Sequence, residues 1–386
     1  MKLSKLSMCA TAVGAALGLA AAGAAHADPI FAPSMTAPLS ANAMPASFDA
    51  GPFGKLSVGG AVSGLGMYQN NHVPGDHQWQ ADFSNAQAWV AKTDGPVQFF
   101  VEVGGYSFPS LGTPYFPAKT QTDLAFGVMP VGYIKIVPNS HFSIIAGKLP
   151  TLIGSEYGFT FQNMNINRGL LWNQEPLISR GVQANFSQGP IALSVAFTDG
   201  FYSNRYNQLS GLLTFTVNAS NSIAFAGGGN LGSTPKVGFA TPLVLDNSSV
   251  YNLFFSHTSG PLTISPYLQY THVSENPGLG IVHSASTWGG AILGKYSFTP
   301  EFAIAARGEY IKSSGTAASG APSLLYGNES KAWSLTVTPT YQKGIYFVRG
   351  EAAYTKIIDG TPGAMLGGFF NDDSQFRLAA EAGVIF

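Results

Sequence analysis

Arginine and glutamate recur in pairs of like parity on three late segments of the chain: Arg307 with Glu309, Arg349 with Glu351, and Arg377 with Glu381. In an extended strand, side chains of like parity share a face, and those two residues apart lie about 7 Å from each other. Along a water-filled passage, such a row of opposite charges predicts a transverse field that sorts solutes by charge and dipole. The structural alternative is that the paired charges stiffen a wetted wall, and the two interpretations are compatible.

A second polar set lies in the long link over residues 149–176, which carries Glu156, Asn163, Asn165, Asn167 and Arg168. The same link holds apolar residues that need cover from water: Phe159, Phe161, Met164, Ile166, Leu170 and Leu171. Folding of the link into a barrel would bury these side chains and turn the amides and Arg168 toward the passage, which predicts a constriction. Glu102, on the polar side of an earlier segment, is predicted to line the same passage. The alternative is a loop packed as an outer cap or a subunit contact.

Signals for enzyme chemistry are weak. The seven histidines are scattered without metal-ligand spacing, and the sequence contains no G-x-S-x-G motif and no complete phosphate loop. We therefore predict a protein that is not an enzyme and uses neither cofactor nor metal. An outer-membrane lipid hydrolase is an alternative that would need a Ser or Asp–His pair on the outer rim.

β-Strands must position these residues. From residue 54 onward, sixteen extended segments alternate with turn signals, the first being Gly54–Tyr68, the fourth Leu124–Val137 and the last Ser374–Phe386. In the last segment every second residue from Phe376 to Phe386 is apolar, whereas the residues between them include Arg377 and Glu381. A soluble sheet turns its apolar face inward, and a membrane barrel turns it toward lipid.

The links between the segments separate these possibilities. Tight turns such as Gln188-Gly189-Pro190 and Lys343-Gly344 alternate with longer links such as 109–123, 149–176 and 313–330. An up-and-down barrel with short periplasmic turns and long extracellular loops produces this alternation, whereas a Greek-key sandwich gives no reason for it. The sequence thus predicts an all-β protein: a transmembrane antiparallel barrel of about sixteen strands with an inward-folded loop.

The N-terminal residues predict export. Lys2 and Lys5 precede an apolar run from Met8 to Ala24, and Ala25-His26-Ala27 follows as a cleavage site, which together indicate a signal peptide over residues 1–27. Residues 28–53 are rich in Pro, Ala and Ser without periodicity, which predicts a flexible periplasmic lead-in before a barrel over residues 54–386. Cys9, the only cysteine, leaves with the signal peptide.

The composition agrees with a barrel surrounded by lipid. Charged residues make up 10% of the chain, well below the roughly 25% of a soluble domain. Without Lys2 and Lys5 the chain has 17 basic and 20 acidic residues, a balance that argues against nucleic acid as a partner.

Several runs carry a family resemblance: PVQFFVEVGGYSFPSLGTPY from Pro96, GKLPTLIGSEYGFTFQNMNINRGLLWNQEP from Gly147, SVYNLFFSHTSGPLTISPYLQY from Ser249 and YFVRGEAAYT from Tyr346. These runs resemble the OmpL-like putative β-barrel porin-2 family of Gram-negative outer-membrane proteins. The resemblance implies a diffusion channel in the outer membrane and a homotrimer, and it supplies no catalytic residue.

The expected function is that of an outer-membrane porin. Small hydrophilic solutes would cross by passive diffusion through a polar, charge-lined lumen narrowed by residues 149–176, with outer-membrane lipid around the barrel. The first alternative is a non-conducting barrel that acts as a surface adhesin or an assembly protein. A soluble secreted β-protein is the remaining alternative.

Overall fold

A computed structural model describes residues 38–40, 42 and 45–386. Residues 1–27, the expected signal peptide, lie outside the described residues. Sixteen long strands follow a short first one: β1 Ala46–Asp49, β2 Lys55–Gln69, β3 Trp79–Lys92, β4 Val97–Tyr106, β5 Val131–Asn139, β6 Phe142–Pro150, β7 Ile178–Gln188, β8 Ile191–Thr198, β9 Gln208–Asn218, β10 Asn221–Asn230, β11 Ser248–Ser259, β12 Leu262–Val273, β13 Ala285–Ser297, β14 Phe302–Ser313, β15 Lys331–Lys343, β16 Tyr346–Ile358 and β17 Ser374–Ile385.

Helical structure is confined to the links. It comprises α1 Ala118–Gln121, α2 Leu243–Asp246, a π-helical turn over Thr122–Phe126, and 3₁₀ turns over Gly51–Phe53, Thr160–Gln162, Leu171–Gln174, Pro277–Leu279 and Ala317–Ser319. No helix in the described part of the chain is long and apolar enough to cross a membrane.

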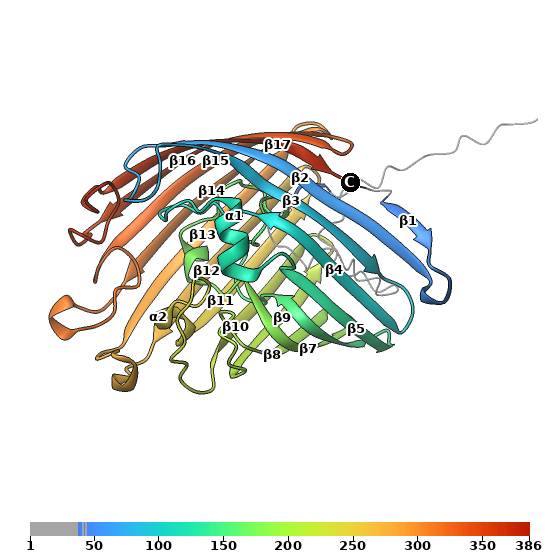
Figure 1. Cartoon of the computed structure of the whole chain (residues 1–386), viewed down its shortest axis with the longest axis horizontal. Helices are drawn as coiled ribbons and strands as arrows, with labels where there is room; N and C mark the ends of the chain where they lie inside the picture. Colours follow the sequence, from blue (N-terminus) through green and yellow to red (C-terminus); the bar gives the residue numbers. More distant parts are fainter. Residues whose placement is uncertain (1–37, 41, 43–44) are drawn as a thin grey trace, which may run out of the picture.

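The strands close into a barrel. Each of β2 to β17 pairs antiparallel with its neighbours in sequence, and β17 pairs back with β2 from Arg377–Gln69 to Ile385–Ala61. The tight turns gather at one end of the strands, and the longer loops gather at the other (Figure 1). The predicted sixteen-stranded up-and-down barrel is thereby confirmed, and closure leaves the barrel strands without a free edge.

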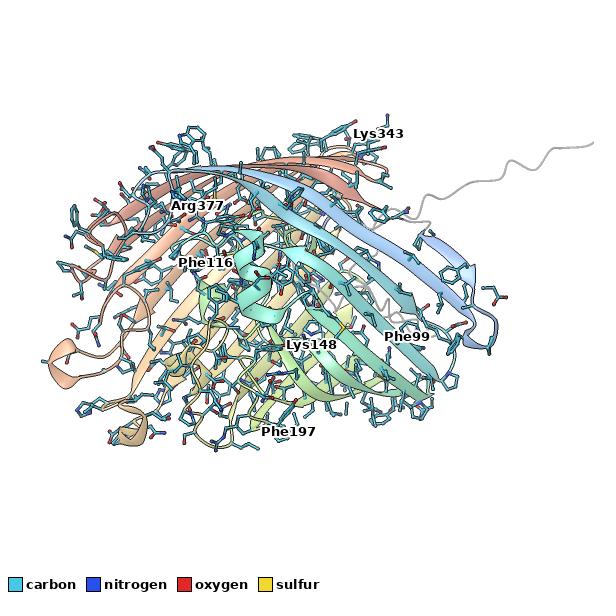
Figure 2. The ribbon with its side chains drawn as sticks, in the orientation of Figure 1. Phe99, Phe116, Lys148, Phe197, Lys343 and Arg377 are labelled. Carbon is cyan, nitrogen blue, oxygen red and sulfur yellow. The ribbon has the colours of Figure 1, made fainter. Side chains whose placement is uncertain are left out.

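The two faces of the wall differ as a lipid-facing barrel requires. On β8, Ile191, Leu193, Val195 and Phe197 are 39–45% exposed, whereas the intervening Ala196 and Thr198 are buried. Phe197 lies at the outer edge of the barrel in Figure 2. The same alternation holds on β17, where Leu378 is exposed and its neighbours Arg377 and Ala379 are buried. Apolar side chains therefore cover the outside, and the polar set faces inward.

The predicted fourth strand, Leu124–Val137, is wrong over its first half. Residues 118–126 form α1 and the π-helical turn, and the strand begins at Val131. The apolar residues of this stretch do not alternate, and the structure uses them in a compact link. Asp82 on β3 holds the link in place by accepting hydrogen bonds from the Ala118 amide at 2.5 Å and the Tyr115 hydroxyl at 3.0 Å.

The segment 28–53, expected to be a flexible lead-in, contains ordered structure where it is described. Strand β1 pairs with the start of β2 from Ala46–Val58 to Asp49–Lys55. Leu39 is buried, and its amide donates a hydrogen bond of 3.1 Å to the Phe161 carbonyl in the link between β6 and β7. Composition alone does not show this order because it comes from contacts with the barrel.

Candidate constriction built by the third long loop

The link between β6 and β7, residues 151–177, is the third long loop of the barrel and is called the crossing loop here. In the closed order of sixteen strands, β14 lies eight places from β6, on the opposite side of the barrel. The crossing loop nevertheless forms hydrogen bonds with β14, β15, β16 and β17. The loop therefore runs through the interior and contacts the wall opposite its own strands.

Apolar side chains fix the crossing loop on both flanks. Leu170 and Leu171 pack in one buried cluster with Phe254 and Tyr267 of β11 and β12. Phe161 stacks on Trp89 of β3 at 5.9 Å between ring centroids. All six apolar residues that the sequence singles out in this loop are at most 3% exposed. Burial of each such side chain contributes about 1.5–3 kcal/mol, so the loop is held firmly.

Glu381 on β17 is a hub for four elements. Its Oε1 accepts hydrogen bonds from Ser84 on β3 at 2.6 Å, from Ser63 on β2 at 3.0 Å and from Thr160 of the crossing loop at 2.6 Å. Its Oε2 forms an ion pair with Arg349 on β16, which the strand register places directly opposite. Arg349 in turn donates to the Asn163 carbonyl at 2.9 Å.

A second hub surrounds Arg307 on β14. Its guanidinium pairs with Glu156 of the crossing loop at 2.6 Å and lies 3.4 Å from Glu309 of its own strand. Glu309 accepts the Leu170 amide at 2.8 and 2.9 Å. The approach is close, because a Cβ on Gly169 would lie 2.2 Å from a Glu309 oxygen. Burial raises the pKa of Glu156 against the opposing effect of Arg307.

The tip of the crossing loop rests on Glu351 of β16. The carboxylate accepts the backbone amides of Ile166 and Asn167 at 2.5 and 2.9 Å and the Asn167 side chain at 2.7 Å. Asn165 donates to the Thr338 hydroxyl at 2.7 Å. Two of the donors to Glu351 are backbone amides. Glu351 therefore binds the main chain of the loop tip, and these two bonds do not depend on the loop's side chains.

Arg377 and Arg168 connect the loop over residues 107–130, the second long loop, to the crossing loop. Arg377 on β17 donates to the Ser110 carbonyl at 2.7 Å and to the Asn167 side chain at 2.9 Å. Arg168 pairs with the same second loop through its backbone, which accepts the Leu111 amide at 2.9 Å. Burial lowers the pKa of Arg168 to about 9, so its guanidinium stays charged at neutral pH.

The structure brings together eleven of the twelve predicted site residues, but in a different arrangement. The pairs on β14 and β16 are separated by β15, whose Ser334 and Thr336 lie opposite Glu309 and Arg307. The charges mainly bind the crossing loop, and the arginines of β14, β16 and β17 are each 1% exposed. Glu102 is the exception, because it lies on β4 beside Trp89 and Val131, away from both hubs.

Several residues of these hubs are absent from the predicted site. They are small polar residues on the inward parity of the strands and in the crossing loop: Ser63, Ser84, Asn85, Thr160, Thr338 and Gln69. For the residues on strands, a position on the inward-facing side was the signal in the sequence that could have identified them. Nothing in the sequence says which serine of a strand meets which carboxylate, because that depends on register.

The described histidines and acidic residues bear on metal and hydrolase chemistry. No group of three or more His, Cys, Asp or Glu residues there is placed to hold a metal ion. The hydrogen bonds of the described histidine rings go to backbone carbonyls, to Asn221 and to Tyr270. None of these bonds joins a described histidine ring to a Ser or Asp side chain.

Asp246, at the end of α2, gives a pH-dependent prediction for the outer loops. Burial raises its pKa from 3.8 to about 6, against the opposing effect of a backbone hydrogen bond from Phe201. A raised native pKa means that loop packing is strongest below about pH 4 and weakens as the pH passes 6. At pH 8, Asp246→Asn should increase the amide exchange protection of residues 231–247 roughly tenfold over the wild type. At pH 4 the two proteins should match, and equal protection at both pH values would contradict the assignment.

A closed antiparallel barrel with an apolar outside, a polar inside and a loop through its interior defines an outer-membrane barrel of the porin class. The chain belongs to the family described as "Putative beta-barrel porin-2, OmpL-like", whose model matches residues 55–386. That match begins at the first residue of β2. A search of curated proteins finds no match.

Solved structures show the same fold at low sequence identity. The outer-membrane expressed OmpT of Vibrio cholerae is 13% identical, with a TM-score of 0.58, over 89% of this chain and 100% of that one. The outer membrane channel DcaP of Acinetobacter baumannii is 11% identical, with a TM-score of 0.57, over 88% and 100%. Salmonella typhi OmpF, in complex with daunomycin, is 12% identical, with a TM-score of 0.53, over 86% and 98%.

Proposed function

We propose that this chain is a general porin that lets small hydrophilic solutes cross the outer membrane by passive diffusion. In this proposal, residues 1–27 direct export, the barrel sits in lipid as a homotrimer, and the crossing loop sets the size limit. The family and the fold support a channel. The observation that carries the proposal is the set of hydrogen bonds between the crossing loop and the opposite wall, because a loop so placed narrows any passage through the barrel.

The charged hubs would act mainly through the loop. Arg307, Arg349 and Glu381 are buried, so they hold the loop rather than present free charges to a solute. Their fixed fields still act across a low-dielectric interior, and we propose that they bias the passage among solutes of different dipole. The transverse-field and wall-stiffening interpretations are thus combined in one set of residues.

Liposome swelling tests the proposal. Proteoliposomes that contain the mature chain should swell in neutral sugars, with rates that fall steeply as the sugar grows from a pentose to a trisaccharide. Protein-free liposomes serve as the control. Equal rates for all sugars would contradict a narrow constriction, and no swelling above the control would contradict diffusion altogether.

One observation favours a second candidate, a non-conducting barrel with a structural or adhesive role. The crossing loop packs on both flanks, and Asn165, Asn167 and Arg168 in its tip are fully buried, as in a plug. A plugged barrel would give no swelling and no ion conductance, so the same experiment separates the two candidates.

A further inference from the structure

The strands on one side of the barrel carry no acidic residue. None of the nine strands from β5 to β13 contains an Asp or a Glu, whereas four basic residues lie on them: Lys135, Lys148, Arg180 and Lys295. The carboxylates of the wall that bind the crossing loop come from β14, β16 and β17. The wall formed by β5 to β13 therefore carries positive charge that no acidic residue of these strands offsets.

Two of these four charges are taken up by links at the long-loop end of the barrel. The Lys148 ammonium donates hydrogen bonds to the carbonyls of Phe126 and Met129 at 3.0 and 2.9 Å. Arg180 forms an ion pair of 2.7 Å with Asp199, whose side chain is fully buried. These two residues stabilise the links, which leaves the other two lysines to be placed.

Lys135 faces the lumen. Its neighbours on β5, Ile134 and Ile136, are 57% and 50% exposed on the outer face, and side chains alternate along a strand, so Lys135 lies on the inward face. The register places it beside Gln98, the second residue of β4 after a tight turn. Lys135 is half-buried, and it forms no ion pair with any residue that the structure describes. Its charge is therefore directed into the passage near the tight-turn end.

Lys295 faces the lumen from the opposite wall. On β13 the adjacent Tyr296 is 43% exposed, whereas Leu293, two residues from Lys295 on the same face, is fully buried. The register places Lys295 beside Thr263, the second residue of β12 after a tight turn. In the closed order of sixteen strands, β13 lies eight places from β5. The two lysines therefore approach the passage from opposite sides, at the same end of the barrel.

The wall between the two lysines is polar and neutral. Asn185 of β7 donates a hydrogen bond of 3.2 Å to Ser143 of β6 and accepts one of 2.8 Å from Ser194 of β8, so the three side chains share the inward face. Thr214 and Ser256, on β9 and β11, are buried on the same face. Hydroxyl and amide groups bind anions and cations alike, because each offers both donors and acceptors.

The acidic residues around the crossing loop do not cancel the two lysine charges. The hubs contain four arginines and four glutamates, which balance in charge: Arg168, Arg307, Arg349 and Arg377 with Glu156, Glu309, Glu351 and Glu381. Burial raises the pKa of Glu175 well above that of an ordinary glutamate, which favours its neutral form. Glu102 on β4 is 3% exposed and pairs in register with Val131, about 13 Å along the strands from Lys135.

We propose that the passage selects small hydrophilic anions over cations, with Lys135 and Lys295 as the residues that determine this preference. A fixed positive charge in a low-dielectric wall raises the concentration of anions in the adjacent water and lowers that of cations. A solute that passes between the two lysines meets a positive potential from both walls. The inference rests on the proposed function, since it concerns solutes that diffuse through the barrel.

The reversal potential of the mature chain in a planar bilayer, under a gradient of KCl, tests the inference. The permeability ratio of chloride to potassium should be at least about 3 for the wild type and should fall to about 1 when Lys135→Gln and Lys295→Gln are combined. Each single variant should lie between these values. Lys343→Gln is the matched control and should leave the ratio unchanged, because Lys343 is an exposed lysine of the same end that lies at the outer edge of the barrel (Figure 2).

Charge reversal extends the test. Lys135→Glu should lower the ratio below that of Lys135→Gln, because a carboxylate at the same place attracts potassium. A wild-type ratio of one or less would overturn the inference without recourse to any variant, as would an unchanged ratio in the combined variant. The absence of openings in the wild type would instead overturn the proposed porin function, so the two failures are distinguishable.

Discussion

Replacing Glu381 by leucine should lower the free energy of unfolding by about 3–5 kcal/mol, because the change leaves the Arg349 guanidinium buried without its counter-charge. It also removes the acceptor that joins Ser84, Ser63 and Thr160 across three elements. The loss is measurable as a shift of the urea midpoint of the barrel in detergent micelles, followed by heat-modifiable gel mobility.

A double variant shows whether the pair acts as a unit. Arg349→Met combined with Glu381→Leu should recover the part of the loss that comes from the unpaired guanidinium, since an apolar pair of similar volume replaces a buried ion pair at little cost. The hydroxyls of Ser84, Ser63 and Thr160 stay without this acceptor, so the remaining loss persists. Lys331→Met, in an ion pair with Asp359 that is largely exposed, is the control and should cost less than about 1 kcal/mol. Strictly additive losses in the double variant would mean that the two residues are not coupled.

Replacing Glu351 by alanine should loosen the crossing loop without unfolding the barrel. Two buried backbone amides, those of Ile166 and Asn167, would lose their acceptor, and each such loss costs about 1–3 kcal/mol. Together the two losses amount to about 2–6 kcal/mol, so the population with a detached loop tip should rise at least about thirtyfold. In a planar bilayer this appears as frequent current fluctuations toward higher conductance.

The control for that experiment is Glu275→Ala in an exposed loop, which should leave the current trace as in the wild type. A quiet trace for Glu351→Ala, equal to the control, would mean that the loop tip does not limit the current. Arg307 still holds Glu156 in the variant, so the base of the loop stays in place.

The barrel could be predicted from the sequence because a lipid-facing wall requires apolar residues at every second position of a strand. Apolar residues every second position, as in Ile191, Leu193 and Val195, mark a strand with one lipid face, and the alternation of turns and loops fixes the topology. The stretch 124–130 was wrongly assigned to a strand, because Leu124 and Phe126 lie in a π-helical turn of a link, where no alternation is required.

The sequence predicted which residues belong to the candidate site better than it predicted which of them contact each other. The alternation of side chains along the strands identified Arg307, Arg349 and Glu381 as inward-facing. Phe159 and Leu170 are apolar residues in a long loop, and their need for cover from water indicated that the loop folds inward. The predicted order already places the strand Lys331–Gln342 between those that carry Arg307 and Arg349. The binding of backbone amides by Glu351 does not follow from the sequence, because it depends on a long-range approach of the crossing loop.

Single-channel conductance of the mature chain in a planar bilayer, before and after deletion of residues 155–173, tests the central claim most directly. The deletion removes the crossing loop between its two flanks, so discrete openings should persist with a conductance raised severalfold. A shorter deletion of residues 277–280 in the exposed loop 274–284 is the control and should leave the conductance unchanged. An unchanged conductance after the longer deletion, or no openings in either protein, would contradict a passage narrowed by this loop.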